Sequence, residues 1–280
     1  MSKTMTFDGR TAVITGAASG IGAALAKDLA KRGCHLALAD INQAGLAEVV
    51  GDIDSQERRI TTHKVDVGQQ GDIERLVDEV RGGHGETHFL FNNAGVAVGG
   101  EFDRISPENF DWLFNINFWG VVHMTRAFMP LLREMDSAQI VNISSIFGVI
   151  APAGQTAYSA SKFAVRGFSD SLRHELAGSS VGVTTVHPGG VNTHIAQSAR
   201  PPSDITQDEF DQSLDRLQEF LVMPPPEAAR IILRGVERRK PRVLVGRDAH
   251  FMAIIERLFP ARYWSIINKQ AGINKPAQAK

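Results

Sequence analysis

The sequence predicts an α/β fold, with one doubly wound parallel sheet that carries helices on both faces. Two observations predict it. Short apolar runs alternate with longer amphipathic ones along most of the 280 residues, which is the pattern of βαβ units with right-handed crossovers. Several of the short runs are apolar nearly throughout, as expected of strands buried on both faces. We therefore expect a single domain over residues 1–280.

The elements follow from this alternation. Seven runs are typical of strands: Thr11–Thr15, His35–Ala39, Ile60–Lys64, Phe89–Phe91, Ile140–Ile143, Val181–Val186 and Arg242–Val245. Five longer segments between them have helical spacing: Gly20–Arg32, Gln69–Arg81, Asn109–Met135, Tyr158–Leu176 and Glu227–Arg238. Strict alternation of this kind places the ligand crevice at the carboxyl ends of the strands.

Two segments stand outside the sheet pattern. Residues 194–226 form a polar insertion that ends at three consecutive prolines, and its apolar residues recur at helical spacing: Phe210, Leu214, Leu217, Phe220 and Leu221. We expect a small helical lid over a ligand site; permanent packing on the domain or on a neighbouring subunit is the alternative. Residues 247–280 form a C-terminal amphipathic extension, whose apolar run lies between Phe251 and Phe259.

The composition argues against several classes of protein. The net charge is −1, which gives no electrostatic basis for binding nucleic acid. The single cysteine, Cys34, excludes an intrachain disulfide, and no spacing of Cys and His is typical of a metal site. The segment from Met1 to Arg10 has no apolar core typical of a signal peptide, and no stretch of the sequence reaches the apolar length of a membrane span. We expect a cytoplasmic protein without a bound metal.

A basic cluster follows the segment at 227–238. It comprises Arg234, Arg238, Arg239, Lys240 and Arg242. We interpret it as a solvated helix end, where cations are stabilised by the helix dipole. Binding of phosphate or of a membrane is the alternative.

The first strand leads into the glycine-rich turn Thr15–Gly22 and then into a helix. Glycines allow a tight turn and a close backbone approach, and a helix N-terminus attracts a phosphate. The spacing differs from G-x-G-x-x-G, but the strand–turn–helix context is the one required. We predict a pyrophosphate site here, rather than a plain tight turn.

Asp40 ends the second strand, about 20 residues beyond the turn. A carboxylate in that position accepts hydrogen bonds from the adenosine ribose and repels a 2′-phosphate. No Arg or Lys occurs at Ser19, Ile41 or Asn42 to offset that charge. The sequence therefore predicts NAD, with NADP less favoured; the alternative is a solvated acid at a strand end.

Tyr158 and Lys162 are four residues apart on one helix face. A neighbouring ammonium is expected to lower the pKa of a Tyr hydroxyl from about 10, so that the hydroxyl can exchange a proton with an alkoxide. Ser145 ends the strand-like run upstream, where its hydroxyl can bind a substrate oxygen. Helix-surface and helix-cap roles are the alternatives for these residues.

Together these motifs resemble the short-chain dehydrogenase/reductase family. The resemblance rests on Thr15–Gly22, Asn92-Asn93-Ala94-Gly95, Asn117, Ser145, Tyr158 with Lys162, and Pro188-Gly189 with Thr193, in the family's order over roughly residues 7–193. It implies a Rossmann-like oxidoreductase whose catalytic residues are Asn117, Ser145, Tyr158 and Lys162. It further implies that Asn117 binds a water linking Lys162 to solvent.

The cofactor residues follow from the turn, from Asp40 and from the resemblance. They are Gly16, Ser19, Gly20, Ile21, Gly22, Asp40, Asp66, Val67, Asn93, Ala94, Gly95, Tyr158, Lys162, Pro188, Gly189, Val191 and Thr193. The resemblance also implies a homo-oligomer, a dimer or more usually a tetramer, formed through the helices at 109–135 and 158–176.

The predicted reaction is hydride transfer between the nicotinamide and a hydrophobic ketone or secondary alcohol. Apolar residues after Ser145 and in the lid favour a bulky substrate, and we predict contacts from Phe147, Phe210 and Leu217. The alternatives are a 3-oxoacyl reductase and a non-catalytic, cofactor-sensing scaffold on the same fold.

Overall fold

The structure is a computed structural model that describes residues 4–54, 58–195, 198–203, 205–206, 208–210, 212 and 218–271. Within these ranges the chain forms a parallel sheet of seven strands in the order β3-β2-β1-β4-β5-β6-β7. The strands are β1 (Thr11–Thr15), β2 (His35–Asp40), β3 (Ile60–Lys64), β4 (Phe89–Asn92), β5 (Ala138–Ile143), β6 (Val181–Pro188) and β7 (Arg242–Val245). The strand order reverses between β1 and β4, so the predicted doubly wound α/β fold is confirmed.

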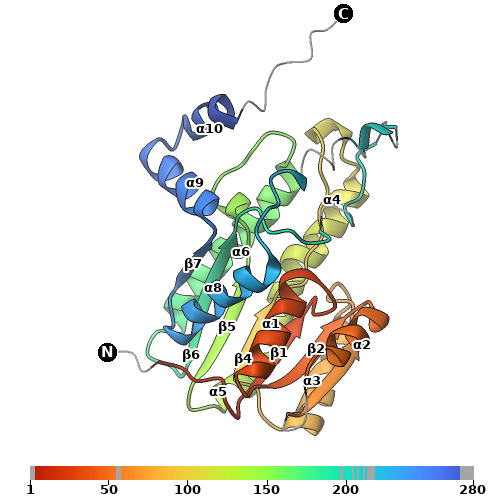
Figure 1. The fold of residues 1–280 in the computed structure, drawn as a ribbon, viewed down its shortest axis with the longest axis vertical. Helices are drawn as coiled ribbons and strands as arrows, with labels where there is room; N and C mark the ends of the chain where they lie inside the picture. The colour runs from red at the N-terminus through yellow and green to blue at the C-terminus, as the bar shows by residue number, and fades with distance from the viewer. Residues whose placement is uncertain are drawn as a thin grey trace, which may run out of the picture.

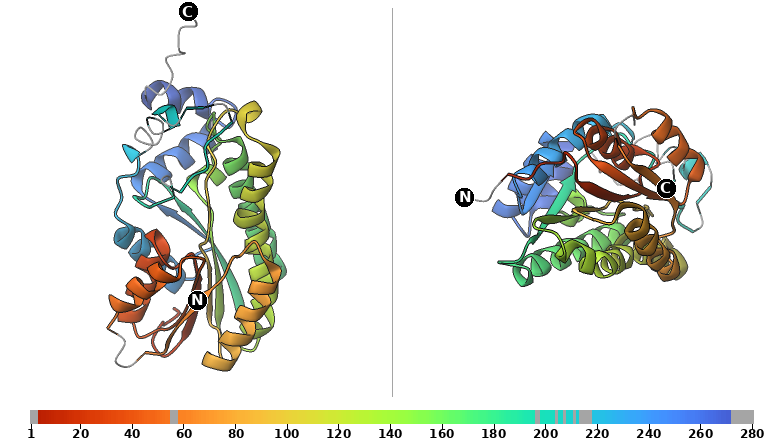
Figure 2. Two further views of the ribbon diagram at one scale, coloured as in Figure 1. Left: turned by 90° about the vertical axis from the view of Figure 1, so that its right-hand side faces the viewer. Right: turned by 90° about the horizontal axis from the view of Figure 1, so that it is seen from below.

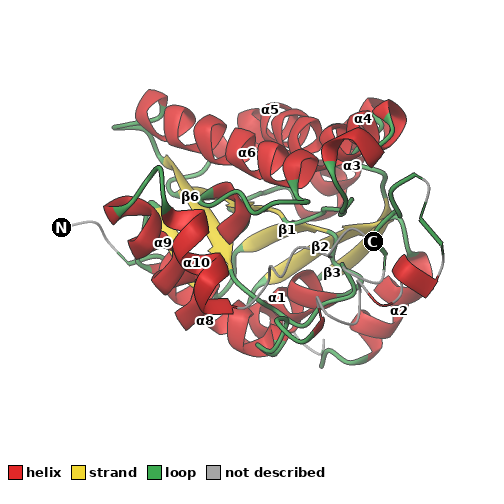
Figure 3. Ribbon diagram, turned by 90° about the horizontal axis from the view of Figure 1, so that it is seen from above, coloured by secondary structure: helices red, strands yellow, loops and turns green. Residues whose placement is uncertain are grey.

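Helices cover both faces of this sheet (Figures 1 and 2). They are α1 (Gly20–Lys31), α2 (Gln43–Gly51), α3 (Gln70–His84), α4 (Pro107–Phe114), α5 (Gly120–Arg133), α6 (Thr156–Glu175), α8 (Pro225–Glu237), α9 (Arg247–Leu258) and α10 (Tyr263–Ala271). α1, α2 and α8 lie on one face and α3 to α6 on the other (Figure 3). Each face therefore has its own apolar core, one around Leu25 and Ile232 and the other around Leu76 and Phe128.

Two helices differ from the expected pattern. α2 was not predicted, because only Leu46, Val49 and Gly45 of its nine residues are buried and its periodicity is short. The helix expected over 109–135 is present as one uninterrupted run over residues 107–133, made of α4, a π-helical turn at Asn115–Trp119, and α5. π-Turns of this kind are frequent at functional sites, and this one carries Asn117.

The C-terminal extension adds α9 and α10 beyond β7, at the carboxyl end of the sheet (Figure 1). Part of this pair packs on the segment after β5, where Ile146 and Ile150 meet Ala249 and Ile267. Tyr263 Oη accepts a hydrogen bond from the Ala151 N–H at 2.9 Å. Across the described ranges, no helix combines the length and apolarity needed to cross a membrane.

Candidate active site

The turn between β1 and α1 requires glycine at several positions. Gly16 and Gly20 have φ values of +64° and +53°, a conformation that disfavours other residues. A Cβ on Gly16 would lie 2.8 Å from the Ala94 Cα, and a Cβ on Gly22 would collide with the Gly16 carbonyl oxygen. The turn is thus drawn tightly against the end of β4, and Ile21 follows it in the first turn of α1.

The start of α1 directly follows the glycine turn. Its N-cap residue, Ser19, makes no side-chain capping hydrogen bond, as is also the case at the starts of α3, α6, α8 and α9. Backbone N–H groups at an uncapped helix start beside a glycine turn suit a phosphate anion.

Asp40 lies at the carboxyl end of β2 beside this turn. Its carboxylate accepts hydrogen bonds from the Ala18 N–H at 3.0 Å and from the Asn42 N–H at 2.9 Å. Within the described part of the chain, no Arg or Lys forms a salt bridge with Asp40, and Ile41 beside it is 65% exposed. The carboxylate is thereby held in place beside the glycine turn by two backbone N–H groups.

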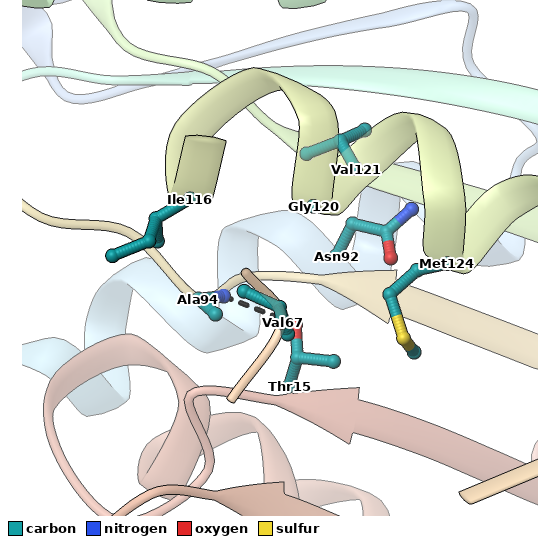
Figure 4. Close-up of a pocket in the computed structure, with 8 residues that line it drawn as sticks. All are labelled: Thr15, Val67, Asn92, Ala94, Ile116, Gly120, Val121 and Met124. Atoms are coloured by element: carbon teal, nitrogen blue, oxygen red, sulfur yellow. Dashed lines mark hydrogen bonds between the residues drawn. The ribbon is translucent and has the colours of Figure 1, made fainter. Parts of the chain in front are cut away.

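Thr15 joins the β1 turn to the segment after β4. Its Oγ1 accepts hydrogen bonds from the Asn93 N–H at 3.0 Å and the Ala94 N–H at 3.1 Å, the latter drawn in Figure 4. The Asn93 amide donates to the carbonyl oxygens of Thr15 and Gly16, each at 3.0 Å. Asn93 therefore fixes the glycine turn through its side chain.

Val67 and Ala94 line one small gap below α5, together with Ile116 and Gly120 (Figure 4). The gap has no room for a water molecule. A Cβ on Gly120 would lie 3.0 Å from Val67 Cγ2. Asp66 precedes Val67 and accepts a hydrogen bond from the Gly68 N–H at 2.8 Å, so this loop after β3 is held by its own side chain.

Three predicted catalytic residues come together at the ends of β5 and α6. The Tyr158 hydroxyl lies close enough to the Ser145 side chain for an interaction that favours its ionised form. The Lys162 Nζ lies 5.6 Å from the centre of the Tyr158 ring and donates to the Ile143 carbonyl oxygen at 3.2 Å. Lys162 is buried, at 3% exposure, and Ser145 is 9% exposed. The arrangement can hold a carbonyl or hydroxyl oxygen between two hydroxyl groups.

The expected lowering of the Tyr158 pKa is wrong for the protein chain alone. Burial raises this pKa to about 12, although the interaction with Ser145 opposes the rise. Burial also lowers the pKa of Lys162 to about 8. Desolvation of the phenolate outweighs the attraction of an ammonium that does not contact the hydroxyl. At neutral pH Tyr158 is therefore a proton donor.

Asn117 is fully buried in the π-turn. Its Oδ1 accepts from the Val96 N–H at 2.8 Å, and its Nδ2 donates to the Val96 carbonyl oxygen at 3.0 Å. Gly95 lies between Asn117 and Lys162, because a Cβ there would be 3.3 Å from Asn117 Oδ1 and 3.4 Å from Lys162 Nζ. Asn117 thus lies near Lys162, while the water that would link Lys162 to solvent stays a prediction.

The loop after β6 reaches back to the glycine turn. A Cβ on Gly20 would lie 3.0 Å from Thr193 Cγ2, so Thr193 sits directly against the start of α1. Val191 is buried, and Pro188 and Gly189 begin the loop at the end of β6. The structure thus brings the loop predicted to contact the nicotinamide to the turn predicted to hold the pyrophosphate.

Two supporting residues were missed or underestimated in the sequence. Asp248 of α9 accepts a hydrogen bond from the Gly190 N–H at 2.7 Å, and its place near the loop after β6 is visible only in three dimensions. His187, interpreted from sequence as structural, is buried and its Nδ1 lies 2.9 Å from the Ser145 carbonyl oxygen. Burial lowers the His187 pKa to about 4, so a neutral imidazole donates this bond and positions Ser145.

The predicted substrate residues have different positions. Phe147 lies edge-on to Tyr158, with ring centres 6.2 Å apart. Phe210 is buried at 8% exposure, while Leu214 and Leu217 lie outside the described residues. Arg200, in the described part of the insertion, stacks 3.6 Å from the centre of the Trp112 ring. The insertion therefore reaches α4, on the same side as the apolar cluster around Val98 that contacts Tyr158.

Over the described ranges, no group of three or more His, Cys, Asp and Glu side chains has the geometry of a metal site. Polar groups instead form a buried network below the catalytic residues. Asn92 donates to Asn142 Oδ1 at 2.8 Å, and Asn142 donates to Ser169 Oγ at 2.9 Å. This network joins β4, β5 and α6, and so fixes the helix that carries Tyr158.

The fold and this arrangement of loops define a class of nucleotide-binding oxidoreductase. The model of the short chain dehydrogenase family matches residues 10–204. The chain is 38% identical over 271 residues to SadH of Mycobacterium tuberculosis, an oxidoreductase by name, covering 96% of this chain and 97% of that one. The protein therefore belongs to the short-chain dehydrogenase/reductase family.

Two further relatives are more distant. The 3-oxoacyl-[acyl-carrier-protein] reductase FabG of Thermotoga maritima is 30% identical over 229 residues, covering 82% of this chain and 91% of that one. A short-chain dehydrogenase/reductase from Burkholderia phymatum, solved in complex with NAD, superposes with a TM-score of 0.84 at 28% identity over 99% of both chains.

Proposed function

We propose that this protein transfers a hydride between a nicotinamide cofactor, preferably NAD, and a hydrophobic ketone or secondary alcohol. One observation carries the proposal: Tyr158, beside Ser145 and close to Lys162, lies at the same carboxyl end of the sheet as the glycine turn that starts α1. Hydride chemistry needs both parts, one to hold the dinucleotide and one to handle the proton.

The cofactor-side residues fit a dinucleotide. The glycine turn leaves no Cβ between the backbone and a pyrophosphate, and the start of α1 offers N–H groups. Asp40 would bind the adenosine ribose, Asp66 and Val67 the adenine, and Thr193 the carboxamide. The related Burkholderia phymatum protein binds NAD, which supports the same choice in this chain. The bound nicotinamide would supply or accept the hydride at its ring.

The chain's own residues handle the substrate oxygen and its proton. In the reduction direction, Ser145 donates a hydrogen bond to the carbonyl oxygen and so stabilises the negative charge that develops on it. Tyr158 gives its proton to that oxygen as the carbon–hydrogen bond forms, and the products are the alcohol and a phenolate that Lys162 stabilises. In the oxidation direction the same phenolate removes the hydroxyl proton.

The surroundings of Tyr158 favour an apolar substrate. Phe147 borders the ring on one side. On the other, Val96 and Val98 belong to the cluster that also packs against Tyr158. These contacts are apolar, which favours a hydrophobic substrate over a sugar.

A 3-oxoacyl reductase is the second candidate, favoured by the relationship to FabG. Asp40 argues against it where the reductant is NADPH, because the carboxylate repels a 2′-phosphate. A non-catalytic scaffold is disfavoured by the presence of all four residues Asn117, Ser145, Tyr158 and Lys162.

The proposed reaction is tested by a panel of aliphatic, aromatic and steroidal ketones, a 3-oxoacyl thioester and a sugar ketone, followed by nicotinamide absorbance with NADH and NADPH. We expect turnover with hydrophobic ketones and a preference for NADH. If only the thioester is turned over, the proposed substrate is an acyl compound and not a simple ketone. If no substrate is turned over, the result favours the non-catalytic scaffold.

We further propose that the protein assembles through α5 and α6. Trp119, at the end of the π-turn, is 47% exposed and Phe163 of α6 is 39% exposed. Exposed aromatic residues of this kind are typical of subunit contacts. Light scattering on the wild type and on Phe163→Ser tests this: the variant should have the lower mass, and an unchanged monomer mass in both would contradict it.

A further inference from the structure

A basic groove lies between α8 and the edge strand β7, outside the active site. It encloses about 390 Å³. Arg234 and Arg238 of α8 line it, together with Lys240 and Arg242 at the start of β7 and His250 of α9. Four cations therefore surround one hollow at the open edge of the sheet.

The charges of these four cations are only partly offset by the chain. Within the described residues, none of them forms a salt bridge. Arg239 of the same cluster instead turns inward and donates to Ser137 Oγ at 2.7 Å and to the Ser180 carbonyl oxygen at 3.1 Å. The acids that act on Arg242 are Asp170 and Glu256, and Asp170 is already bonded to Arg173 at 2.7 Å. The groove thus keeps an excess of positive charge that an anion can balance.

An exposed apolar stripe on α9 continues from this groove. Its residues are Phe251, Ile254, Leu258 and Phe259, which are 44%, 56%, 63% and 46% exposed. Ile254 and Leu258 follow the groove residue His250 at intervals of four, so all three share one helix face. α9 stands beside β7 and away from the body of the sheet (Figure 1). Charged groove and apolar stripe together form one amphipathic surface.

We propose that this surface binds the face of an anionic phospholipid membrane. Headgroup phosphates bind the cations of the groove, and the stripe of α9 enters the boundary between headgroups and acyl chains. A second copy that placed groove on groove across a two-fold axis would oppose the cations of one groove to those of the other. A dissolved phosphate compound would leave the stripe in water. The membrane accounts for both features.

Membrane binding would bring the active site close to lipid. α9 and α10 pack on Ile146, Val149 and Ile150, the residues that follow Ser145. A hydrophobic substrate could then reach Tyr158 from the membrane instead of from water. The membrane proposal itself does not depend on the proposed reaction.

Sedimentation with vesicles tests the surface directly, using the full chain and no substrate. We expect it to sediment with vesicles of phosphatidylglycerol and phosphatidylcholine, to bind pure phosphatidylcholine weakly, and to dissociate in about 1 M salt. Arg234→Gln with Arg238→Gln should weaken binding by about thirtyfold, since each cation near an anionic surface contributes about fivefold. The matched control, Lys31→Gln with Lys64→Gln, removes two exposed cations elsewhere and should bind like the wild type.

A second pair of variants tests the stripe. Ile254→Ser with Leu258→Ser should lower binding to the anionic vesicles by roughly tenfold or more. Phe102→Ser is the control, because Phe102 is 66% exposed and lies outside the stripe. The melting temperature of all variants should match that of the wild type.

Three results would overturn the proposal. One is the absence of binding to anionic vesicles at low salt. Another is a lower particle mass by light scattering for Ile254→Ser with Leu258→Ser, which would make the stripe a contact between copies. The third combines two measurements. If calorimetry shows that inorganic pyrophosphate binds only when Arg234 and Arg238 are present, and the stripe variant still binds vesicles like the wild type, the groove is a site for a dissolved anion.

Discussion

Two parts of the active site are built in different ways: the cofactor end, around the glycine turn and Asp40, and the carbonyl end, around Ser145 and Tyr158. At the cofactor end, the glycine turn is held by residues of two neighbouring strands: Asp40 binds the Ala18 N–H, and Asn93 binds the carbonyls of Thr15 and Gly16. These bonds join backbone to short polar side chains. The cofactor end is therefore fixed before any ligand binds.

The carbonyl end draws on segments far apart in the chain. Ser145 is positioned by His187, the loop after β6 by Asp248 of α9, and the segment after Ser145 by Tyr263 of α10. Its walls are apolar side chains rather than hydrogen-bonded turns. The proposed function therefore makes cofactor choice depend on one carboxylate, and substrate choice depend on packing contributed by many elements.

The largest effect is expected from a substitution that changes only the carbonyl end. Tyr158→Phe keeps the ring and its contact with Phe147 but removes the proton, so turnover should fall by about 10²–10⁴-fold. Binding of NADH, followed by fluorescence, should not change, because the cofactor end is held by other residues. Retention of more than about a tenth of the wild-type turnover would contradict the assignment of Tyr158.

The pH dependence of the two directions should differ for the same reason. Burial keeps the proton on Tyr158, with a pKa of about 12 in the protein chain alone. Reduction of a ketone needs that proton and should not slow between pH 6 and about 8. Oxidation of the alcohol needs the phenolate and should accelerate as pH rises. Initial rates in both directions across this range provide the measurement, and oxidation that does not change with pH would count against a tyrosine base.

The second effect changes the cofactor end and leaves the carbonyl end intact. Asp40→Ala with Ile41→Arg removes the ribose acceptor and adds a cation. The preference for NADH over NADPH in kcat/KM should then shift by about tenfold to a hundredfold toward NADPH, the equivalent of a charged hydrogen bond. Ile41→Ala alone is the control. An unmutated enzyme without a preference for NADH would show that another cation reaches the 2′-phosphate.

A smaller effect is expected at His187. Its folded pKa of about 4 lies below the ordinary value near 6.5, so the unfolded chain binds more protons between these values. Stability contributed by the neutral His187 is present above about pH 6.5 and is lost as pH falls toward 4. His187→Leu should therefore reduce the slope of melting temperature against pH in this window. Some slope should remain, because burial lowers the His84 pKa to about 4 as well.

The same variant also tests the positioning role. Without the imidazole, the Ser145 carbonyl loses its donor, and kcat should fall by about tenfold while the Kd for NADH stays constant. His194→Ala, an exposed histidine beyond the loop after β6, is the control. A lower melting temperature with unchanged kcat would make His187 only a packing residue.

The smallest effect concerns the insertion. If Phe210 covers the substrate, Phe210→Ala should raise KM for a bulky ketone by about tenfold and leave a small ketone nearly unaffected. Phe220→Ala, at a side chain that is 52% exposed, serves as the comparison. A large loss of melting temperature with unchanged substrate preference would instead show that Phe210 packs permanently on the domain.

The two ends also differ in how far the sequence predicts them. The sheet, its strands and the glycine turn follow from local patterns, because buried parallel strands are apolar and a tight turn needs glycine. Tyr158 and Lys162 could be paired because four residues on a helix share a face. Asp40 could be placed because it ends a strand beside the turn.

The remaining features are not local. Asp248 and Tyr263 act on loops more than 50 residues away in sequence, and nothing in their own segments indicates the partner. The π-turn at Asn117 lies within the expected helix, and the continuous helical periodicity from 109 to 135 does not reveal it. The Tyr158 pKa depends on burial, which the spacing of Tyr and Lys cannot reveal.

The most direct test of the central claim is a double-mutant cycle on the substrate oxygen. Turnover of a hydrophobic ketone with saturating NADH is measured for the wild type, Ser145→Ala, Tyr158→Phe and the double variant. Because both hydroxyls act on one oxygen, we expect the double variant to be barely slower than Tyr158→Phe alone. Losses that multiply independently would contradict a shared oxygen and, with it, the proposed reaction geometry.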